Sequence, residues 1–511
     1  MRAFSLSLTI AVAVAYGTAD DEIKALPGWA HELPSKMYSG YVDVSAAMNQ
    51  TMHVHYWFIE AEKPLDPSSA PVVLWTNGGP GASSMFGMLV ELGPLLLNED
   101  SLATDDFKKT GVPTLFRNDQ AWTKLGSVLM FDWPPPVGFS YCEDPKGDGK
   151  SCGDWDDERM AEVSYAALAG WFDKFPERRA NPLYLTGESY AGIYVPKLAQ
   201  KVLAHADPKV LPQLKGFAVG DGCLGSESGV CGRGSGPWWG LLFLYGHGQI
   251  STLLYDEVVA ACGMHYLKFG GDEPAGCAAP LARVSVEAAG YFPYNLYDDC
   301  IYQDGGLRRR RLTGTGAGSA DERYTLSASG RLLGSFGPGA RLGGAENDYV
   351  CGGGVAQNVW TNVTAVRAAL NVPLDSLFFS GDNGEGMVYK TSEKNLIPFY
   401  RTVASTTKLR VLVYNGDTDP AINSFEAQNW TAALGFEPTQ PWRAWTLDHC
   451  LRMGGYVTRY EKDRFDYLTI RGSGHMVPEF KPEASLEFLR AWLAEKDYPR
   501  YVGTCTKPPA Q

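Results

Sequence analysis

One serine, one aspartate and one histidine stand in settings where they could act together as a nucleophile and its base. Ser189 lies in the stretch G-E-S-Y-A-G at 187–192, after an apolar run and before a segment with helical spacing. Small neighbours at such a strand-to-helix turn let a serine hydroxyl stand clear of a sheet. Asp419 and His475 each follow an apolar run, and Asp417 competes with Asp419 for the role of orienting the histidine. A serine needs a base and the base needs an acceptor, so this order of residues predicts covalent acyl transfer.

The same chemistry needs N–H donors for the negatively charged oxygen that forms during attack. The backbone N–H of Tyr190, directly after the serine, is the expected first donor. The second should come from the loop N-G-G-P-G at 77–81, which follows an apolar run. These glycines could instead form a phosphate-binding loop, but no Lys or Thr follows at the spacing that such a loop requires.

These residues need a sheet whose strand ends bring them together. Short apolar or alternating runs, typical of strands, occur at 52–60, 71–75, 127–131, 181–186, 214–219, 408–414 and 467–470. Helical spacing occurs at 157–175, 362–370 and 482–493. Alternating strands and helices predict a mostly parallel central sheet with helices on both faces. Together with the turn at Ser189, this pattern predicts an α/β-hydrolase fold.

The middle of the chain breaks this rhythm and reads as an insertion, or cap, that is helical and rich in cysteine. We therefore predict a core in two parts, 20–222 and 352–511, separated by the insertion 223–351. Within it, 303–344 is rich in glycine and contains four consecutive arginines at 308–311. This loop is either a disordered linker or a site cut by a processing protease that recognises basic residues, and we favour processing.

The composition indicates a globular protein of the secretory pathway. Residues 1–19 combine an early arginine, an apolar run and small residues, as in a signal peptide. No later stretch offers about 20 consecutive apolar residues, so no membrane span is predicted. Glycosylation acceptor triplets begin at Asn49, Asn362 and Asn429. The net charge of −13 argues against nucleic acid or an anionic membrane as a partner.

The cysteine content predicts disulfides. The chain contains 10 cysteines, an even number that suits an oxidising compartment. Short loops favour the pairs Cys142–Cys152, Cys223–Cys231 and Cys262–Cys277, which leaves Cys300–Cys351 and Cys450–Cys505. The last two pairs are the least constrained by spacing.

Four segments together resemble one family of enzymes. They are W-T-N-G-G-P-G-A-S-S at 75–84, G-E-S-Y-A-G at 187–192, G-D-T-D at 416–419 and G-H-M-V-P at 474–478. In this order they resemble the serine carboxypeptidases, a family with yeast vacuolar, plant and lysosomal protective-protein members. The resemblance implies an enzyme that needs no metal or cofactor and releases the C-terminal residues of peptides and proteins at acidic pH.

The resemblance also implies roles for individual residues. Ser189 would be the nucleophile, His475 the general base and acid, and Asp419 the carboxylate that orients the histidine. The oxyanion donors would be the backbone N–H groups of Gly79 and Tyr190. The family lines the pocket for the leaving residue at positions that correspond to Phe86, Val90, Ile422 and Met476. Ordinary core packing is the alternative for each of these four.

A second set implied by the resemblance would bind the free carboxylate of the substrate. It consists of Asn77, Glu91 and Glu188, with Trp75 behind them. Two adjacent glutamates would repel a carboxylate if both were ionised, whereas a shared proton can hydrogen bond to it. We therefore expect peptide binding to weaken as the pH rises from acidic to neutral.

Two other functions remain as alternatives. Plant relatives include acyltransferases, which deliver the acyl group to an alcohol, but these often carry Asp at the position of Glu188. The other alternative is a protective scaffold for other lumenal hydrolases. The sequence leaves the oligomeric state open, with a homodimer as one candidate, and does not decide between secretion and a vacuolar or lysosomal lumen.

Overall fold

The computed structural model describes residues 19–503, except 145, 148, 206, 289–290, 299, 301–346, 380–386, 449 and 461–463. Three predictions concern residues outside this set. They are the signal peptide, the glycine- and arginine-rich loop with its arginines at 308–311, and the pairing of Cys450 with Cys505. All three stay predictions.

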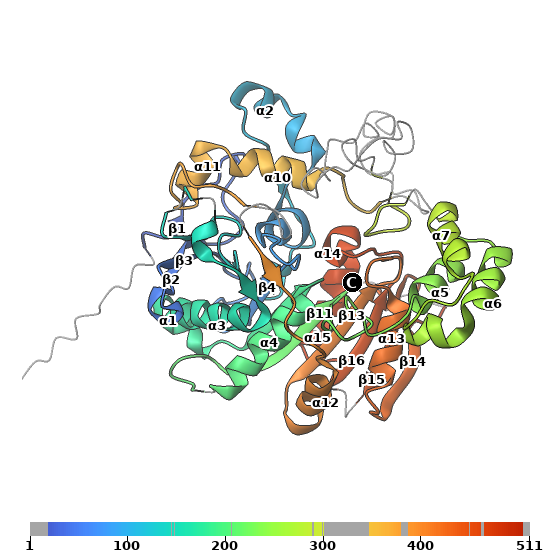
Figure 1. Ribbon diagram of the computed structural model, residues 1–511. Coiled ribbons are helices and arrows are strands. Elements are labelled where there is room, and N and C mark those ends of the chain that lie inside the picture. Colours follow the sequence, from blue (N-terminus) through green and yellow to red (C-terminus); the bar gives the residue numbers. More distant parts are fainter. Residues whose placement is uncertain are drawn as a thin grey trace, which may run out of the picture.

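A 12-stranded mixed sheet forms the centre of the molecule (Figure 1). Its middle strands run parallel in the order β7 (Ser127–Phe131), β4 (Val72–Thr76), β10 (Leu183–Glu188), β11 (Leu214–Gly220), β13 (Arg410–Gly416) and β16 (Phe465–Ile470). These strands are buried almost throughout, because helices cover both faces of the sheet. The predicted parallel centre is confirmed.

Antiparallel strands extend the sheet at both edges. On one side lie β1 (Glu22–Ile23), β2 (Met37–Asp43), β3 (Met52–Ile59) and β8 (Tyr141–Cys142). On the other lie β15 (Met453–Tyr460) and β14 (Pro438–Thr446). The sequence did not predict β14 and β15, because much of β14 is exposed, contains two prolines and lacks an apolar alternation.

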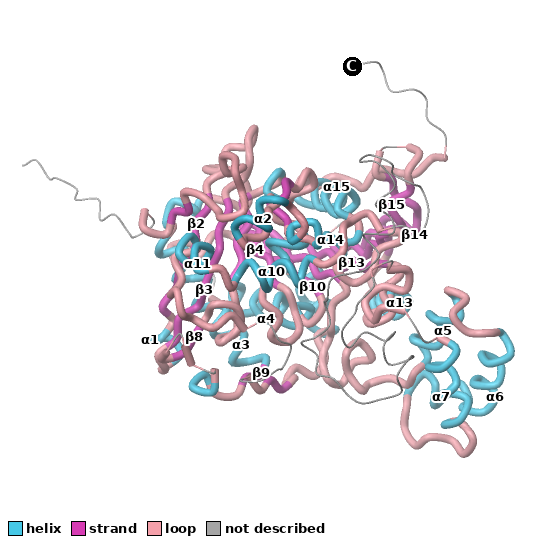
Figure 2. The backbone as a smooth tube through the Cα atoms, turned by 90° about the horizontal axis from the view of Figure 1, so that it is seen from above, coloured by secondary structure: helices cyan, strands magenta, loops and turns pink. Residues whose placement is uncertain are grey.

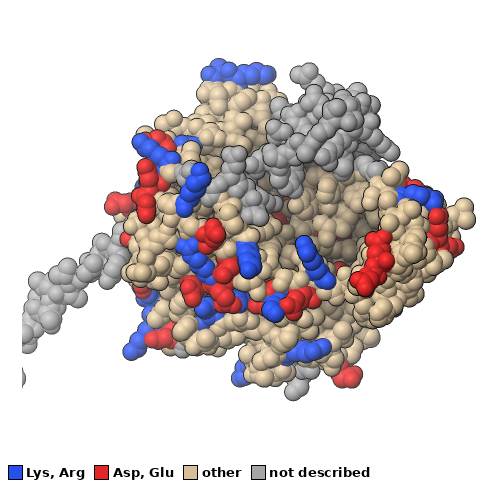
Figure 3. Space-filling view, in the orientation of Figure 1, with Lys and Arg blue, Asp and Glu red and all other residues tan. Residues whose placement is uncertain are grey.

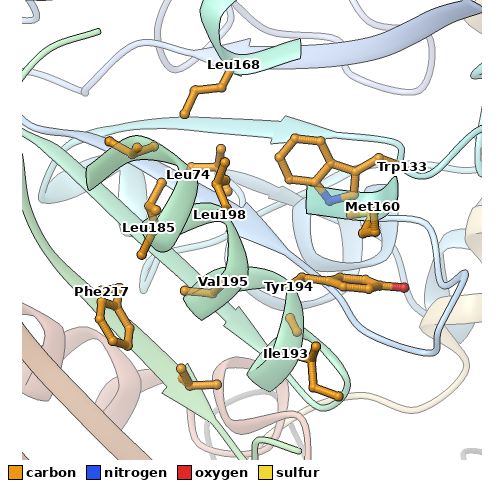
Figure 4. Packing of buried hydrophobic residues seen from close by; sticks show 14 of the residues in the cluster. Leu74, Trp133, Met160, Leu168, Leu185, Ile193, Tyr194, Val195, Leu198 and Phe217 are labelled. Carbon is orange, nitrogen blue, oxygen red and sulfur yellow. The ribbon is translucent and has the colours of Figure 1, made fainter. Parts of the chain in front are cut away.

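Two apolar cores lie on the two faces of the sheet. One packs against α3 (Asp157–Lys174), α4 (Ala191–Ala204), α12 (Ile397–Thr406) and α13 (Ser424–Ala432). Figure 4 shows part of this core, where Leu198 and Val195 of α4 lie over the sheet near Leu74 and Leu185. The opposite core packs against α10 (Gly353–Thr361), α11 (Thr364–Ala369) and α15 (Pro482–Leu493). Helices therefore cover both faces, as predicted.

Three helices of the predicted insertion form a separate group. They are α5 (Trp238–Gly246), α6 (Thr252–Phe269) and α7 (Ala278–Glu287), which share a small apolar cluster of their own. Figures 1 and 2 show this group at one end of the sheet, beside α13. The ring of Phe243 in α5 contacts Phe425 of α13, with centroids 5.6 Å apart. The boundaries of the insertion stay a prediction.

Four of the predicted disulfides are present. They are Cys142–Cys152, Cys223–Cys231, Cys262–Cys277 and Cys300–Cys351. The third links α6 to the start of α7, inside the small helical group. The fourth joins the two segments that flank residues 301–346. A cut within 303–344 would therefore leave the two resulting chains covalently connected.

The remaining helices and strands are short. They are α1 (Ser45–Met48), α2 (Asp105–Thr110), α14 (Val477–Phe480), β5 (Leu95–Leu96), β6 (Phe116–Arg117), β9 (Trp155–Asp156), β12 (Tyr389–Lys390), the π-helix η1 (Gly87–Glu91) and the 3-10 helices η2 (Glu99–Leu102), η3 (Trp122–Lys124), η4 (Lys150–Cys152) and η5 (Pro176–Ala180). Among the described residues, no helix has the length and apolar character needed to cross a membrane. Figure 3 shows basic and acidic side chains interspersed over one face of the molecule.

Candidate active site

Ser189 occupies the sharp turn between β10 and α4 that its sequence predicts. Its φ of +63° lies in the left-handed region, which is strained for a residue with a side chain. The turn brings strand and helix close together, since a Cβ added to Gly187 would lie 2.8 Å from the Cβ of Ala191. A Cβ on Gly192 would lie 2.4 Å from Cys223 N. Glycine is needed at these two positions, whereas the methyl group of Ala191 fits where many hydrolases have a second glycine.

Asp419 and His475 form the hydrogen-bonded pair that the sequence predicts. His475 Nδ1 lies 2.7 Å from Asp419 Oδ2, and both side chains are buried. The backbone N–H groups of Ala421 and Ile422 also donate to the Asp419 carboxylate, at 2.8 and 3.1 Å, which fixes its orientation. His475 Nε2 is buried and has no hydrogen-bond partner among the described residues. This nitrogen is therefore available to accept a proton.

Asp417, the alternative acceptor, has a different hydrogen-bond partner. Its carboxylate accepts a hydrogen bond from the backbone N–H of Gly472 at 2.6 Å. Burial raises its pKa to about 6. His475 Nδ1 hydrogen bonds to Asp419 at 2.7 Å, so the structure favours Asp419 as the orienting carboxylate.

The glycine loop 77–81 packs directly on the turn that carries the serine. A Cβ added to Gly78 would lie 2.3 Å from Tyr190 N and 2.9 Å from the Cβ of Ser189, so only glycine allows this approach. The ring of Tyr190 is anchored elsewhere, with its hydroxyl 2.9 Å from an oxygen of the buried Asp157. These contacts place the loop that contains Gly79 against the turn that carries Ser189 and Tyr190, and the role of both N–H groups as oxyanion donors stays a prediction.

The predicted carboxylate-binding residues form one buried network around Asn77. Its Nδ2 donates to Glu91 Oε1 at 2.8 Å and to Glu188 Oε1 at 3.0 Å. Its Oδ1 accepts the indole N–H of Trp75 at 2.8 Å and the backbone N–H of Gly87 at 3.1 Å. The amide is thus fixed in one orientation by partners on both sides. Glu91 reaches it from the π-helix η1, a type of helix that is frequent at functional sites.

Burial keeps both glutamates of this network protonated to an unusually high pH. It raises the pKa of Glu91 to about 7, despite the hydrogen bond from Asn77. Burial, followed by the negative charge of Glu91, raises the pKa of Glu188 well above its usual value. The second oxygen of each carboxyl, Oε2, has no fixed partner among the described residues. At acidic pH these carboxyl groups can therefore donate hydrogen bonds rather than repel an anion.

Comparison with known proteins agrees with this geometry. A family model described as serine carboxypeptidase matches residues 27–495. The chain belongs to the serine carboxypeptidase family. Lysosomal protective protein of Mus musculus is 33% identical over 487 residues, which cover 94% of each chain. Serine carboxypeptidase-like 20 of Arabidopsis thaliana is 31% identical, with 92% of each chain covered.

A solved structure shows the same fold. A prohormone-processing carboxypeptidase from Saccharomyces cerevisiae aligns with a TM-score of 0.65 and 19% identity, covering 94% of this chain and 96% of the other. The α/β-hydrolase architecture predicted from the order of strands and helices is therefore confirmed. In this serine carboxypeptidase, the parallel strands at the centre of the sheet and the helices on its two faces make up that architecture.

The pocket candidates of this serine carboxypeptidase are mostly buried side chains near the same residues. Val90 precedes Glu91 in η1, Ile422 follows the loop of Asp419, and Met476 follows His475, while Phe86 is half-buried. Their placement agrees with a pocket wall and also with core packing, so their role stays a prediction. The three predicted glycosylation sites are exposed, as glycosylation requires: Asn49, Asn362 and Asn429.

A segment of the predicted insertion reaches the site, which the sequence did not reveal. The carbonyl of Tyr294 accepts the backbone N–H of His475 at 2.8 Å, and the two rings lie with centroids 4.8 Å apart. Asn295 Oδ1 accepts the hydroxyl of Thr418 at 2.8 Å. The insertion thus helps to hold both loops that carry Asp419 and His475. No local pattern marked these contacts, because they join distant parts of the chain.

A second Ser, His and Asp array lies at the edge of the sheet. His55 Nδ1 lies 2.8 Å from Asp132 Oδ2, and its Nε2 lies 2.9 Å from Ser39 Oγ. All three side chains are buried, and the Ser39 hydroxyl donates to the carbonyl of Leu370 at 2.7 Å. Because this hydroxyl is enclosed and already bonded, the array is a structural link between strands rather than a reactive site.

Proposed function

We propose that this serine carboxypeptidase removes amino acids one at a time from the C-termini of peptides and proteins, with Ser189 as nucleophile. The observation that carries the proposal is the Asn77, Glu91 and Glu188 network next to the serine. A generic esterase has no need for buried, protonatable carboxyls at this place. They provide donors for a substrate that ends in a free carboxylate.

In the acylation step, Ser189 Oγ attacks the carbonyl carbon of the last peptide bond. Its proton passes to His475 Nε2, while Asp419 holds the Nδ1–H and stabilises the imidazolium. The backbone N–H groups of Gly79 and Tyr190 stabilise the negative oxygen of the tetrahedral intermediate. The C–N bond then breaks, and His475 gives its proton to the departing amino group.

In the deacylation step, water repeats the attack on the acyl-enzyme ester. His475 takes a proton from the water, and the tetrahedral intermediate collapses to a shortened peptide with a new carboxyl group. Ser189 Oγ recovers its proton from His475. Apart from this water, every group that the two steps use comes from the substrate and these residues.

The four described disulfides support a location in an oxidising lumen of the secretory pathway. Secretion, a vacuolar or a lysosomal destination, a homodimer and processing at residues 308–311 stay predictions. The chain's similarity to a lysosomal protective protein favours no particular one of them, since identity is only 33%.

The decisive experiment incubates the protein with N-blocked dipeptides at several pH values and measures the release of free amino acid. We expect release at acidic pH and a loss of kcat of at least about 10⁴-fold in Ser189→Ala, as for removal of a triad serine elsewhere. The matched control is Ser39→Ala, which removes the hydroxyl of the enclosed array and should leave kcat unchanged. Amide-blocked dipeptides should be poor substrates.

Three outcomes would contradict the proposal. Equal turnover of blocked and free C-termini would indicate an endopeptidase or esterase. Transfer of an acyl group from an ester to an added alcohol, without peptide hydrolysis, would indicate an acyltransferase. Absence of turnover, with stabilisation of other lumenal hydrolases that persists in Ser189→Ala, would indicate a scaffold.

A further inference from the structure

A third buried carboxyl, Asp221, lies beside the predicted catalytic aspartate. It directly follows β11, between the strand that leads to Ser189 and the strand that leads to Asp419. Its φ of +42° is rare for a residue with a side chain. Backbone strain of this kind persists only where the surroundings enforce it, and it is concentrated at functional sites.

Fixed donors hold the Asp221 carboxyl in place. Asn415 Nδ2 donates to its Oδ1 at 3.0 Å, and the backbone N–H of Gly416 lies 3.1 and 3.2 Å from its two oxygens. The same Asn415 Nδ2 donates to the carbonyl of Ile422 at 3.0 Å. Asp221 is therefore tied to both ends of the loop that carries Asp419.

Asp221, Asp419 and His475 lie within one small cluster. One polar atom from each lies within 4.8 Å of the others, and both carboxyl groups are fully buried. A cation could bind such groups, but the 2.7 Å between His475 Nδ1 and Asp419 Oδ2 is hydrogen-bond spacing. The two buried carboxyl groups are therefore adjacent. Adjacent carboxyl groups can hydrogen bond to each other only when one of them carries a proton.

The surroundings decide which carboxyl holds the proton. Asp419 accepts three N–H groups, including the imidazole that becomes cationic during the reaction, so it is the anion. The groups that face Asp221 are Asp419, Glu188, Tyr414, Tyr467 and the His475 imidazole. No lysine or arginine in the described part of the chain forms an ion pair with either aspartate. Burial and the Asp419 charge raise the pKa of Asp221 well above its usual value.

We propose that Asp221 is a positioning residue that stays protonated in the working enzyme and donates its hydroxyl hydrogen to the Asp419 carboxylate. This bond and the donors to Asp221 hold Asp419 in line with His475 Nδ1. Loss of the proton at higher pH would place a second negative charge beside Asp419, which would disturb the pair. This inference rests on the proposed roles of Asp419 and His475.

The test compares Asp221→Asn with Asp221→Gly. Asparagine keeps the shape, tolerates positive φ and offers an N–H donor that does not titrate, while glycine removes the side chain without backbone strain. We expect Asn to keep kcat near the wild-type value and Gly to lower it by about tenfold or more with little change in KM, because small misplacements of a catalytic group are costly. Asp417→Asn, on the same loop but hydrogen-bonded to Gly472, is the matched control and should leave kcat unchanged.

The pH profile of kcat separates positioning from a purely structural role. Wild-type kcat should fall at high pH as Asp221 loses its proton, and this fall should be absent in Asp221→Asn. Measurement of kcat at saturating substrate excludes the effect of Glu91 and Glu188 on binding. If Asp221→Gly does not fold, the pH profile of kcat in Asp221→Asn decides by itself.

The inference would be overturned if kcat of Asp221→Gly equalled that of the wild type, or if both variants lost kcat equally. It would also be overturned if kcat of Asp221→Asn fell at high pH as the wild-type kcat does. A wild-type enzyme without any peptide turnover would instead refute the proposed function. The two failures are therefore distinguishable.

Discussion

In the proposed function, Glu188 couples attack to recognition, because it directly precedes Ser189 and shares the amide of Asn77 with Glu91. Strand β10 ends at Glu188 and Ser189 follows it directly, so one strand positions both residues. A single turn therefore presents the proposed nucleophile and one wall of the proposed site for the substrate carboxylate. This explains why an ionisable residue is buried beside a reactive serine.

The protonation of this pair predicts how peptide binding depends on pH. Below the raised pKa of Glu91, about 7, the carboxyls are neutral donors, and above it they repel the substrate carboxylate. KM for N-blocked dipeptides should therefore rise as the pH increases from about 5 to above about 7. Glu188→Gln should reduce this rise, and the double variant with Glu91→Gln should remove it, as measured by initial rates. Amide-blocked substrates are the control, since their KM should not rise.

At the scale of elements, buried hydrogen bonds between side chains hold neighbouring strands together, in addition to the apolar cores. The Ser39, His55 and Asp132 array joins β2, β3 and the end of β7. Ser83 also donates to Asp132 and thereby ties in the loop before η1. Because η1 carries Glu91, this edge of the sheet supports the carboxylate-binding network.

Replacing the buried histidine should destabilise the fold without affecting the chemistry. His55→Phe preserves an aromatic ring but removes the histidine partner of the buried Asp132 carboxylate, which should cost about 3–5 kcal/mol of unfolding free energy. Urea denaturation measures this loss, and kcat of the folded enzyme should be unchanged. The control is His53→Phe, at a half-buried position on the same strand, where we expect about 0.5 kcal/mol or less. A large loss of kcat in His55→Phe at full folding would contradict the structural role.

At the scale of the molecule, buried acids should make the protein more stable at acidic than at neutral pH. Burial raises the pKa of Glu91 and Glu426 to about 7 and that of Asp417 to about 6. Unfolding returns these groups to their usual values near 4, so between about 4 and about 7 the unfolded chain binds fewer protons. The free energy of unfolding must then fall as the pH rises through this window. Groups with lowered pKa, such as Asp448, titrate below the window and do not oppose this trend.

Thermal denaturation at constant ionic strength tests this expectation, and Tm should be higher at pH 5 than at pH 7.5. Glu426→Gln removes one of these acids away from the site, so it should reduce the difference in Tm while leaving kcat unchanged. An equal or higher Tm at pH 7.5 would show that the buried acids are ionised in the folded protein.

The sequence by itself determined the features that depend on local pattern. Buried parallel strands, the turn at Ser189 and the order Ser189, Asp419, His475 follow from short apolar runs and small residues, whose conformations are set within a few positions. The local pattern left Asp417 as a competitor of Asp419, and the resemblance to the family favoured Asp419. The structure supports Asp419, because His475 hydrogen bonds to it whereas Asp417 accepts the N–H of Gly472.

Only the tertiary structure decided the contacts between distant segments. The antiparallel strand β15 pairs with β16, and β14 pairs with β15, so these two strands are recognisable by their pairing rather than by their own alternation. Tyr294 supports His475 from within the predicted insertion. Asp221 meets Asp419 because β11 and β13 are neighbours in the sheet, and strand neighbours are set by packing of the whole chain rather than by local spacing.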